Sequence, residues 1–200
     1  MSEERLLNEV VTAWTGEHLH RYNIAEGYIH KNAIVLDIAT GTGYGACQLS
    51  KVTGGNVIGG DISTEAIDDC KKKWAFQKNL HFQVMDGTAL PFTDNYFDAV
   101  ISFETIEHTT KYREMLGELG RVAKAEGIIL ISTPNILINS KGGKVLNKYH
   151  TQEFSYEELV ILLNMYFSSV KVFGQFYNRY SGNKKFRYSI AFVIERIFLT

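Results

Sequence analysis

One aspartate and three alternating glycines lie in the segment VLDIATGTGYGA, residues 35–46, in a pattern that suits a small-molecule site. Asp37 ends an apolar run, and Gly41 and Gly43 follow it. Glycines let a turn approach a ligand closely because they have no Cβ atom. The Asp37 carboxylate would repel a pyrophosphate and attract a cation. With Asp61, which suits ribose hydroxyls, the pattern favours a cationic nucleoside over the dinucleotide that the glycine spacing alone would also allow.

A second group of chemically active residues, Glu104, Glu107 and His108, lies in the segment ETIEH. If this segment turns into a helix, its spacing puts two carboxylates and an imidazole on one face. Such a group can hold a divalent ion, or His108 can act as a general base because imidazole titrates near neutrality. The glutamates can also simply stabilise a helix start. All three interpretations stay open.

The segments around these residues alternate between short β-branched runs and amphipathic stretches at helical spacing. The expected strands are 33–39, 56–63, 80–86, 97–103, 127–134 and 168–176. The expected helices between them are 44–52, 64–78, 111–124 and 155–166. This order predicts a doubly wound α/β fold, with a mainly parallel sheet and helices on both faces.

The two ends of the chain and one long connection are less regular. Residues 3–14 and 18–30 have the apolar spacing of two short amphipathic helices. The segment FRYSIAFVIERI favours a strand over a helix because it is rich in β-branched and aromatic residues. The connection 135–154, with two glycines and three lysines, is expected to be irregular. No linker or repeat divides the chain, so residues 1–200 are predicted to form one domain.

Composition narrows the classes of partner. The formal charge of −1, from 21 basic and 22 acidic residues, gives no overall field for a polyanion, which disfavours extended nucleic acid and anionic membranes. Cys47 and Cys70 are too few for a disulfide framework, which fits a reducing, cytoplasmic setting. The start MSEERLLNEV has no apolar targeting core, and the apolar runs are too short for a membrane span.

Four motifs in register make residues 18–175 similar to class I S-adenosylmethionine-dependent methyltransferases, in their small-molecule type 11, ubiquinone-biosynthesis-like branch. These motifs are VLDIATGTGYG, VIGGDIS, VMDGTALPFTDNYFDAVISFETIEH and LGRVAKAEGIILISTPN. The resemblance implies a seven-stranded sheet with an antiparallel last strand, and residues 1–30 would fold as a helical lid over the cofactor. It implies cofactor contacts for Arg21, Asp37, Gly41, Gly43, Asp61, Ile62, Asp86, Gly87 and Phe103. Ala39 departs from the common pattern, which has glycine there.

The acceptor side carries a second resemblance. E-x-x-E-H resembles the metal motif of ubiquinone-biosynthesis O-methyltransferases and of small-RNA 2′-O-methyltransferases, and His150 in YHTQEF stands where the latter have a second histidine. Glu104, His108 and His150 are therefore the expected catalytic residues. The residues that would hold Mg or Mn are Glu104, Glu107, His108 and His150.

Motifs that the chain lacks make some classes of methyl acceptor unlikely. The chain has SFET where base N-methyltransferases have (Asp/Asn)-Pro-Pro-(Tyr/Phe), and neither cysteine follows a proline as a cytosine C5 nucleophile commonly does. Residues 149–175 resemble bacterial family members from sugar-modification pathways. The resulting expectation is O-methylation of a small polar molecule such as a sugar or nucleotide-sugar. The alternatives are a metal-dependent RNA 2′-O-methyltransferase and a non-catalytic S-adenosylmethionine-binding protein.

Overall fold

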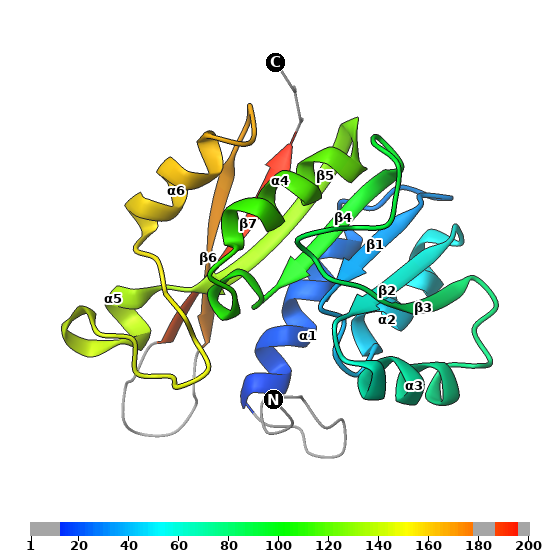
Figure 1. The fold of residues 1–200 in the computed structure, drawn as a ribbon, viewed down its shortest axis with the longest axis horizontal. Coiled ribbons are helices and arrows are strands. Elements are labelled where there is room, and N and C mark those ends of the chain that lie inside the picture. Colours follow the sequence, from blue (N-terminus) through cyan, green and yellow to red (C-terminus); the bar gives the residue numbers. More distant parts are fainter. Residues whose placement is uncertain (1–12, 178–186, 196–200) are drawn as a thin grey trace.

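The computed structural model describes residues 13–177 and 187–195 (Figure 1). The sheet has the strand order β3-β2-β1-β4-β5-β7-β6. Neighbouring strands from β3 to β5 pair in parallel, and β7 pairs antiparallel with both β5 and β6. The strands are β1 (Val35–Ile38), β2 (Val57–Asp61), β3 (Leu80–Val84), β4 (Phe97–Phe103), β5 (Ala123–Pro134), β6 (Lys171–Tyr177) and β7 (Arg187–Glu195). The doubly wound, mainly parallel fold and the antiparallel last strand are as predicted.

Helices cover both faces of the sheet (Figure 1). One face packs under α1 (Ala13–Glu26), α2 (Tyr44–Thr53) and α3 (Thr64–Lys73). The other packs under α4 (Tyr112–Val122) and α6 (Tyr156–Asn164). Successive residues of one strand enter opposite cores, because strand side chains alternate in direction: Val35 packs with the first group and Leu36 with the second.

Local signals explain where two of these helices begin. Ser155 accepts a hydrogen bond from the Glu158 amide at 3.2 Å, and Glu158 Oε2 accepts one from the Ser155 amide at 2.8 Å. This reciprocal capping box starts α6, as the sequence predicts. Ser63 caps α3 with a single hydrogen bond, which its hydroxyl accepts from the Ala66 amide.

Three expectations about helices were wrong. Residues 13–26 form one continuous helix, α1, although a break after residue 14 was expected; most of the expected helix 3–14 lies outside the described residues. The helix expected over 64–78 ends at Lys73, and the Trp74 indole then donates a hydrogen bond to the Thr42 carbonyl at 2.9 Å. The connection 135–154 is not wholly irregular, because it contains α5 (Ile136–Asn139) and the 3₁₀ turn η2 (Lys141–Gly143).

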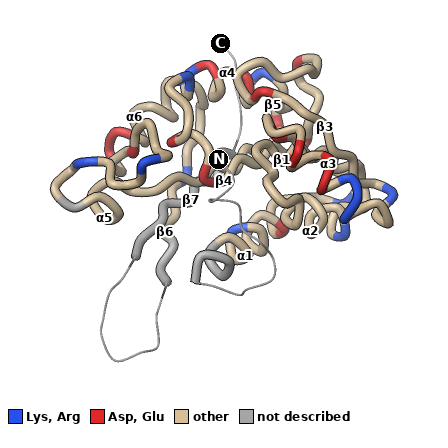
Figure 2. Tube along the Cα trace, turned by 60° about the horizontal axis from the view of Figure 1, so that its bottom comes forward, with Lys and Arg blue, Asp and Glu red and all other residues tan. Residues whose placement is uncertain are grey.

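Charged residues of both signs are spread over the surface (Figure 2). The basic group at the end of α3, Lys71, Lys72 and Lys73, follows two acidic residues of the same helix, Asp68 and Asp69. None of the helices in the described part of the chain has the length and apolar character that a bilayer crossing needs.

Candidate cofactor and acceptor site

The glycine turn follows β1 at the carboxyl edge of the sheet. Gly41 and Gly43 have φ angles of 56° and 73°, which are in the left-handed region that favours glycine. A Cβ atom on Gly43 would lie 2.8 Å from the Phe82 ring, so this position also needs glycine for space. Ala39 has φ 59° without being glycine, so the departure from the family pattern introduces backbone strain.

Asp37 lies at the end of β1, and its side chain is buried with 1% exposure. Its carboxylate accepts hydrogen bonds from the Tyr22 hydroxyl, at 2.9 Å, and from the Thr40 hydroxyl. Burial raises the pKa of Asp37 to about 6, although these two hydrogen bonds oppose the rise. Asp37 is therefore a buried carboxylate, and a cationic ligand beside it would stabilise its ionised form.

Asp61 and Asp86 follow the next two strands along the edge. Asp61 accepts hydrogen bonds from the Gly41 amide at 3.0 Å and from the Ser63 amide at 2.9 Å, so it ties the glycine turn to the start of α3. Ile62 beside it is 62% exposed, which suits a flat apolar ligand such as adenine. Hydrogen bonds from Thr88 lower the pKa of the exposed Asp86 carboxyl, and the partly exposed Gly87 follows it.

Helix α1 brings two side chains to this edge. Tyr22 packs edge-on against Phe103, with ring centroids 5.1 Å apart, and a Cβ atom on Gly45 would lie 2.0 Å from the Tyr22 ring. Gly45 therefore makes room for α1, and this third alternating glycine was the sequence signal for Tyr22 that the sequence analysis missed. Arg21, with 1% exposure, forms an ion pair with Glu104 at 3.4 Å.

The residues at this edge fit the predicted cofactor. The Tyr44 hydroxyl is buried and has no hydrogen-bond partner among the described residues, and its ring packs against Tyr22. Burial and the nearby Asp37 charge raise the Tyr44 pKa, so the hydroxyl is a neutral donor in need of an acceptor atom. S-adenosylmethionine has one carboxylate and two positive charges, which match the donors Tyr44 and Arg21 and the carboxylates Asp37 and Asp61. Tyr44 is a further site residue that the sequence analysis missed.

Glu104 belongs to the cofactor side of the site. Its φ angle of 52° is left-handed, so the segment 104–108 does not continue as a helix, and only residues Ile106–His108 form a 3₁₀ turn, η1. The Glu104 Oε1 atom accepts a hydrogen bond from the Ser132 hydroxyl at 2.9 Å and faces Arg21. The expectation that Glu104 shares a helix face with Glu107 and His108 was therefore wrong.

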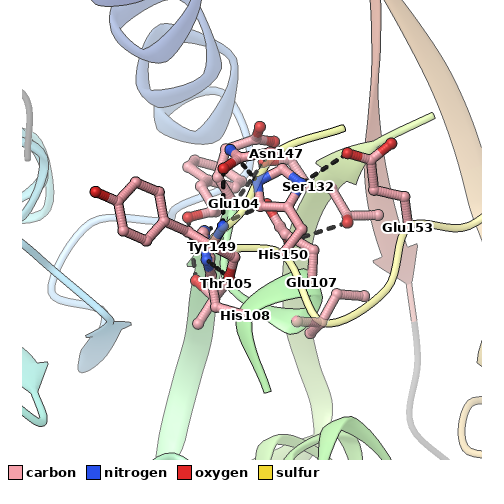
Figure 3. A network of polar contacts seen from close by, with 12 residues as sticks. Glu104, Thr105, Glu107, His108, Ser132, Asn147, Tyr149, His150 and Glu153 are labelled. Atoms are coloured by element: carbon pink, nitrogen blue, oxygen red, sulfur yellow. Dashed lines mark hydrogen bonds and ion pairs between the residues drawn. The ribbon is translucent and has the colours of Figure 1, made fainter. Parts of the chain in front are cut away.

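Glu107, His108 and His150 come together from two separate segments (Figure 3). One potential ligand atom from each lies within 4.8 Å of those of the others, and the two imidazole rings are 4.8 Å apart, edge to face. Glu107 is fully buried, and its Oε2 accepts a hydrogen bond from Thr133 at 2.9 Å. Burial, and then the charge of Glu104, raise the Glu107 pKa.

We name the segment 147–153 the histidine loop. Thr151 and Gln152 of this loop donate hydrogen bonds to backbone carbonyls in and next to η1. Thr151 donates from its amide, at 2.7 Å, and from its hydroxyl, at 3.0 Å, to the Glu107 carbonyl. Gln152 donates to the carbonyls of Ile106 and Thr109 at 2.6 and 2.9 Å. These bonds place His150 beside His108, as the E-x-x-E-H resemblance implied.

Another residue near this cluster was missed by the sequence analysis. His18 on α1 is partly exposed and feels the charges of Arg21 and Glu104. Burial, followed by the Arg21 charge, lowers the pKa of His18 to about 4, so it is neutral at physiological pH. No motif pointed to it, because its position is set by where α1 docks.

Comparisons with known proteins agree with this geometry. Residues 36–131 match the family model described as "Methyltransferase domain". The chain is 33% identical over 132 residues to the ubiquinone/menaquinone biosynthesis C-methyltransferase UbiE of Desulfotalea psychrophila, covering 64% of this chain and 53% of that protein. It is 29% identical over 145 residues to a probable S-adenosylmethionine-dependent methyltransferase of Mycobacterium tuberculosis, Rv3030, covering 72% of this chain and 52% of that protein.

One further curated protein and one solved structure are also similar to this chain. The chain is 30% identical over 146 residues to a sterol 24-C-methyltransferase of Pneumocystis carinii, covering 72% of this chain and 36% of that protein. The solved YcgJ protein of Bacillus subtilis has the same fold, with a TM-score of 0.72 and 17% identity, covering 90% of this chain and 99% of that one. The chain spans about half the length of the first curated relatives that it matches. Residues 36–131 are thus a methyltransferase domain, and the motifs, the sheet order and these likenesses support the class I S-adenosylmethionine-dependent methyltransferases, in their type 11, ubiquinone-biosynthesis-like branch.

Proposed function

We propose that this protein transfers a methyl group from S-adenosylmethionine to a small polar molecule. The observation that carries the proposal is the position of the Glu107, His108 and His150 cluster next to the cofactor residues. The two groups meet at the ion pair between Arg21 and Glu104. A proton-accepting cluster beside a methyl donor is the arrangement that methylation of a protonated acceptor needs.

Each residue of the cofactor side has a role in this proposal. Asp61 accepts from the ribose hydroxyls, Ile62 and Gly87 face the adenine, and Arg21 pairs with the cofactor carboxylate. When bound, S-adenosylmethionine supplies an electrophilic methyl group on a sulfonium. Asp37 and Tyr44 would hold the methionine part of the cofactor beside Phe103.

The acceptor side removes the proton. His108 Nδ1 lies 3.1 Å from the Tyr149 carbonyl, which can only accept, so Nδ1 carries the hydrogen and Nε2 has the lone pair. Nε2 would take the proton from the acceptor, and S-adenosylmethionine would supply the methyl group that the acceptor's lone pair receives, with the sulfur as leaving group. Glu107, whose Oε1 is 3.9 Å from Nε2, stabilises the imidazolium that results.

Oxygen is the acceptor atom that this cluster suits best, because a hydroxyl gives its proton directly to an imidazole. A sugar or nucleotide-sugar hydroxyl fits the polar character of the histidine loop. Carbon is the second candidate, because two of the relatives are named as C-methyltransferases. An activated ring carbon also loses a proton after methylation, so the same base would serve it.

Glu107, His108 and His150 can also hold Mg or Mn. Their mixed carboxylate and imidazole donors are ligands that Mn²⁺ accepts. A bound ion would lower the proton affinity of an acceptor oxygen and orient it. Glu104 would not be a ligand in this arrangement, because it is occupied by Arg21 and Ser132.

The first test is calorimetric titration with S-adenosylmethionine and its demethylated product, in chelator and again with Mg²⁺ or Mn²⁺. Asp61→Ala should weaken binding by roughly tenfold or more, since it removes charge-assisted hydrogen bonds. Asp68→Ala, at an exposed position of α3, is the matched control. Absence of binding to the wild type would overturn the proposal.

The second test is a methylation screen with ¹³C-methyl-labelled cofactor against sugars, nucleotide-sugars, phenols and short RNA. The chemical shift of the product methyl separates oxygen from carbon acceptors. Methylation of RNA alone, with affinity that falls steeply as salt rises, would favour the 2′-O-methyltransferase alternative. Cofactor binding without turnover of any class would favour a non-catalytic binding protein.

A further inference from the structure

His150 is held from behind by a buried carboxylate. Its Nδ1 atom is 2.7 Å from Glu153 Oε1, and the side chains of His150 and Glu153 are only 8% and 2% exposed. The other oxygen of Glu153 accepts a hydrogen bond from the Ser140 hydroxyl at 2.7 Å. Figure 3 shows Glu153 on the side of His150 that faces away from His108.

The neighbours of His150 determine which ring nitrogen carries the hydrogen. Asn147 Oδ1 accepts from the Tyr149 amide at 3.0 Å, which fixes the orientation of the Asn147 amide. Its Nδ2 atom, a donor, therefore faces His150 Nε2 at 2.9 Å, and Nε2 must accept. Nδ1 then carries the hydrogen and donates it to Glu153. Two independent neighbours thus require the same tautomer.

We propose that Glu153 is a positioning residue that fixes His150 in the tautomer whose Nε2 lone pair an acceptor can use by displacing the Asn147 amide. This inference rests on the proposed function, because His150 matters only if an acceptor binds there. The Asn147 amide occupies the lone pair in the structure, and an acceptor hydroxyl takes its place as donor. His150 then accepts a hydrogen bond from the acceptor while His108 receives the proton of the reacting hydroxyl. The site therefore selects an acceptor with at least two neighbouring hydroxyl or amine donors.

The position of Glu153 suits this role better than that of a loop anchor alone. A buried carboxylate is costly unless hydrogen bonds satisfy it, and Glu153 has donors on both oxygens. The histidine loop is already fastened to η1 through Thr151 and Gln152, which need no charge. Carboxylates that hold the far nitrogen of a functional histidine fix its tautomer and orientation, and their loss weakens ligand affinity or activity about 10–100-fold in metal sites.

The test is a long-range ¹H–¹⁵N spectrum of histidine-labelled protein, with the His150 signals assigned by their loss in His150→Gln. The expected wild-type spectrum has a protonated Nδ1 and an unprotonated Nε2 for His150. In an Asn147→Ala background, which removes the other neighbour that selects the tautomer, Glu153→Ala should give a mixed or reversed tautomer, whereas Glu157→Ala, at an exposed position of α6, should leave the signals unchanged. A protonated Nε2 in the wild type would overturn the proposal, even if the variant failed to fold.

Two controls separate this inference from the proposed function. The demethylated cofactor product, titrated by calorimetry, should bind wild type and Glu153→Ala with affinities that agree within about twofold, because Glu153 lies outside the cofactor residues. A wild type that does not bind this product would sink the proposed function while leaving the tautomer result standing. An unchanged His150 tautomer when Glu153→Ala is added to the Asn147→Ala background, in a protein that binds the product normally, would leave Glu153 as a structural anchor only.

Discussion

The two halves of the candidate site are built in different ways. The centre of the cofactor half is the glycine turn after β1, in which the backbone amide of Gly41 donates to Asp61, twenty residues further along. The acceptor half joins η1 to the histidine loop through side chains separated by 41 to 46 residues, such as His108 with Tyr149 and Gln152 with Ile106. In the proposed function, a local motif therefore binds the cofactor, and long-range contacts build the side that receives its methyl group.

The largest expected effect separates the two halves by function. His108→Ala should lower the rate of methyl transfer by about 10²–10⁴, because it removes the general base, and should leave cofactor affinity within about twofold. The rate is measured with the acceptor found in the methylation screen, and the affinity by calorimetry. The exposed His81→Ala serves as control. A parallel loss of cofactor affinity would mean that the halves are not separable.

The next effect concerns the space that the cofactor half requires. Gly43→Ala should destabilise the protein by about 2–5 kcal/mol, from left-handed strain and from overlap with Phe82. Gly142→Ala, in the acceptor-side connection, has a similar φ of 78° but open space around its Cβ position, so only about 1 kcal/mol is expected. Chemical denaturation measures both. Equal losses would show that backbone strain alone makes Gly43 necessary.

One pH effect should come from Asp37, the buried carboxylate of the cofactor half. The pKa of Asp37 is raised from 3.8 to about 6 in the folded protein, so its proton stabilises the fold below about pH 4 and this contribution is lost as the pH rises through 6. Above pH 6, the free energy of unfolding of Asp37→Asn should therefore exceed that of the wild type by up to about 3 kcal/mol. This difference should be smaller near pH 4. Denaturation across pH 4 to 8 tests the window.

The same substitution should weaken cofactor binding, because it removes the negative charge that attracts the sulfonium and ammonium. Titration with S-adenosylmethionine at pH 7.5 measures this loss. A variant that is both more stable and equally strong in binding would show that Asp37 has only a structural role.

The smallest expected effect is a gain in stability. Ala39→Gly should stabilise the protein by roughly 0.5–1 kcal/mol, because glycine adopts the observed φ of 59° without strain. Ala33→Gly, at a buried position before β1 that has no left-handed φ, should instead destabilise it. Thermal denaturation of the two variants measures both changes in stability. A loss of stability in both variants would exclude backbone strain at Ala39.

Much of the fold and of the cofactor half could be predicted from sequence because the signals are local. Alternating runs predicted the sheet and its helices, and Asp37 and Asp61 lie at strand ends as expected. The acceptor half was only partly predictable. The position predicted for Glu104 was wrong because its left-handed φ interrupts the helical spacing. No sequence pattern predicts such a φ angle at a glutamate.

The residues missed by the sequence analysis share one physical cause. Tyr22 reaches the site because α1 docks against α2, where its ring packs on Tyr44, and Glu153 is held by a hydrogen bond from Ser140, thirteen residues before it. Such positions depend on tertiary packing, which leaves no periodic trace in the sequence. Only Gly45, which makes room for the Tyr22 ring, is a readable signal of this kind.

The hydrogen bond from the Trp74 indole to the Thr42 carbonyl has a practical consequence. Indole emission responds to the polarity and hydrogen bonding around the ring, and this ring is joined directly to the glycine turn. The chain has only two tryptophans, Trp14 and Trp74. In a Trp14→Phe background, Trp74 would be the single tryptophan of the protein. Its fluorescence would then report ligand binding at the glycine turn in real time, without any added dye or label.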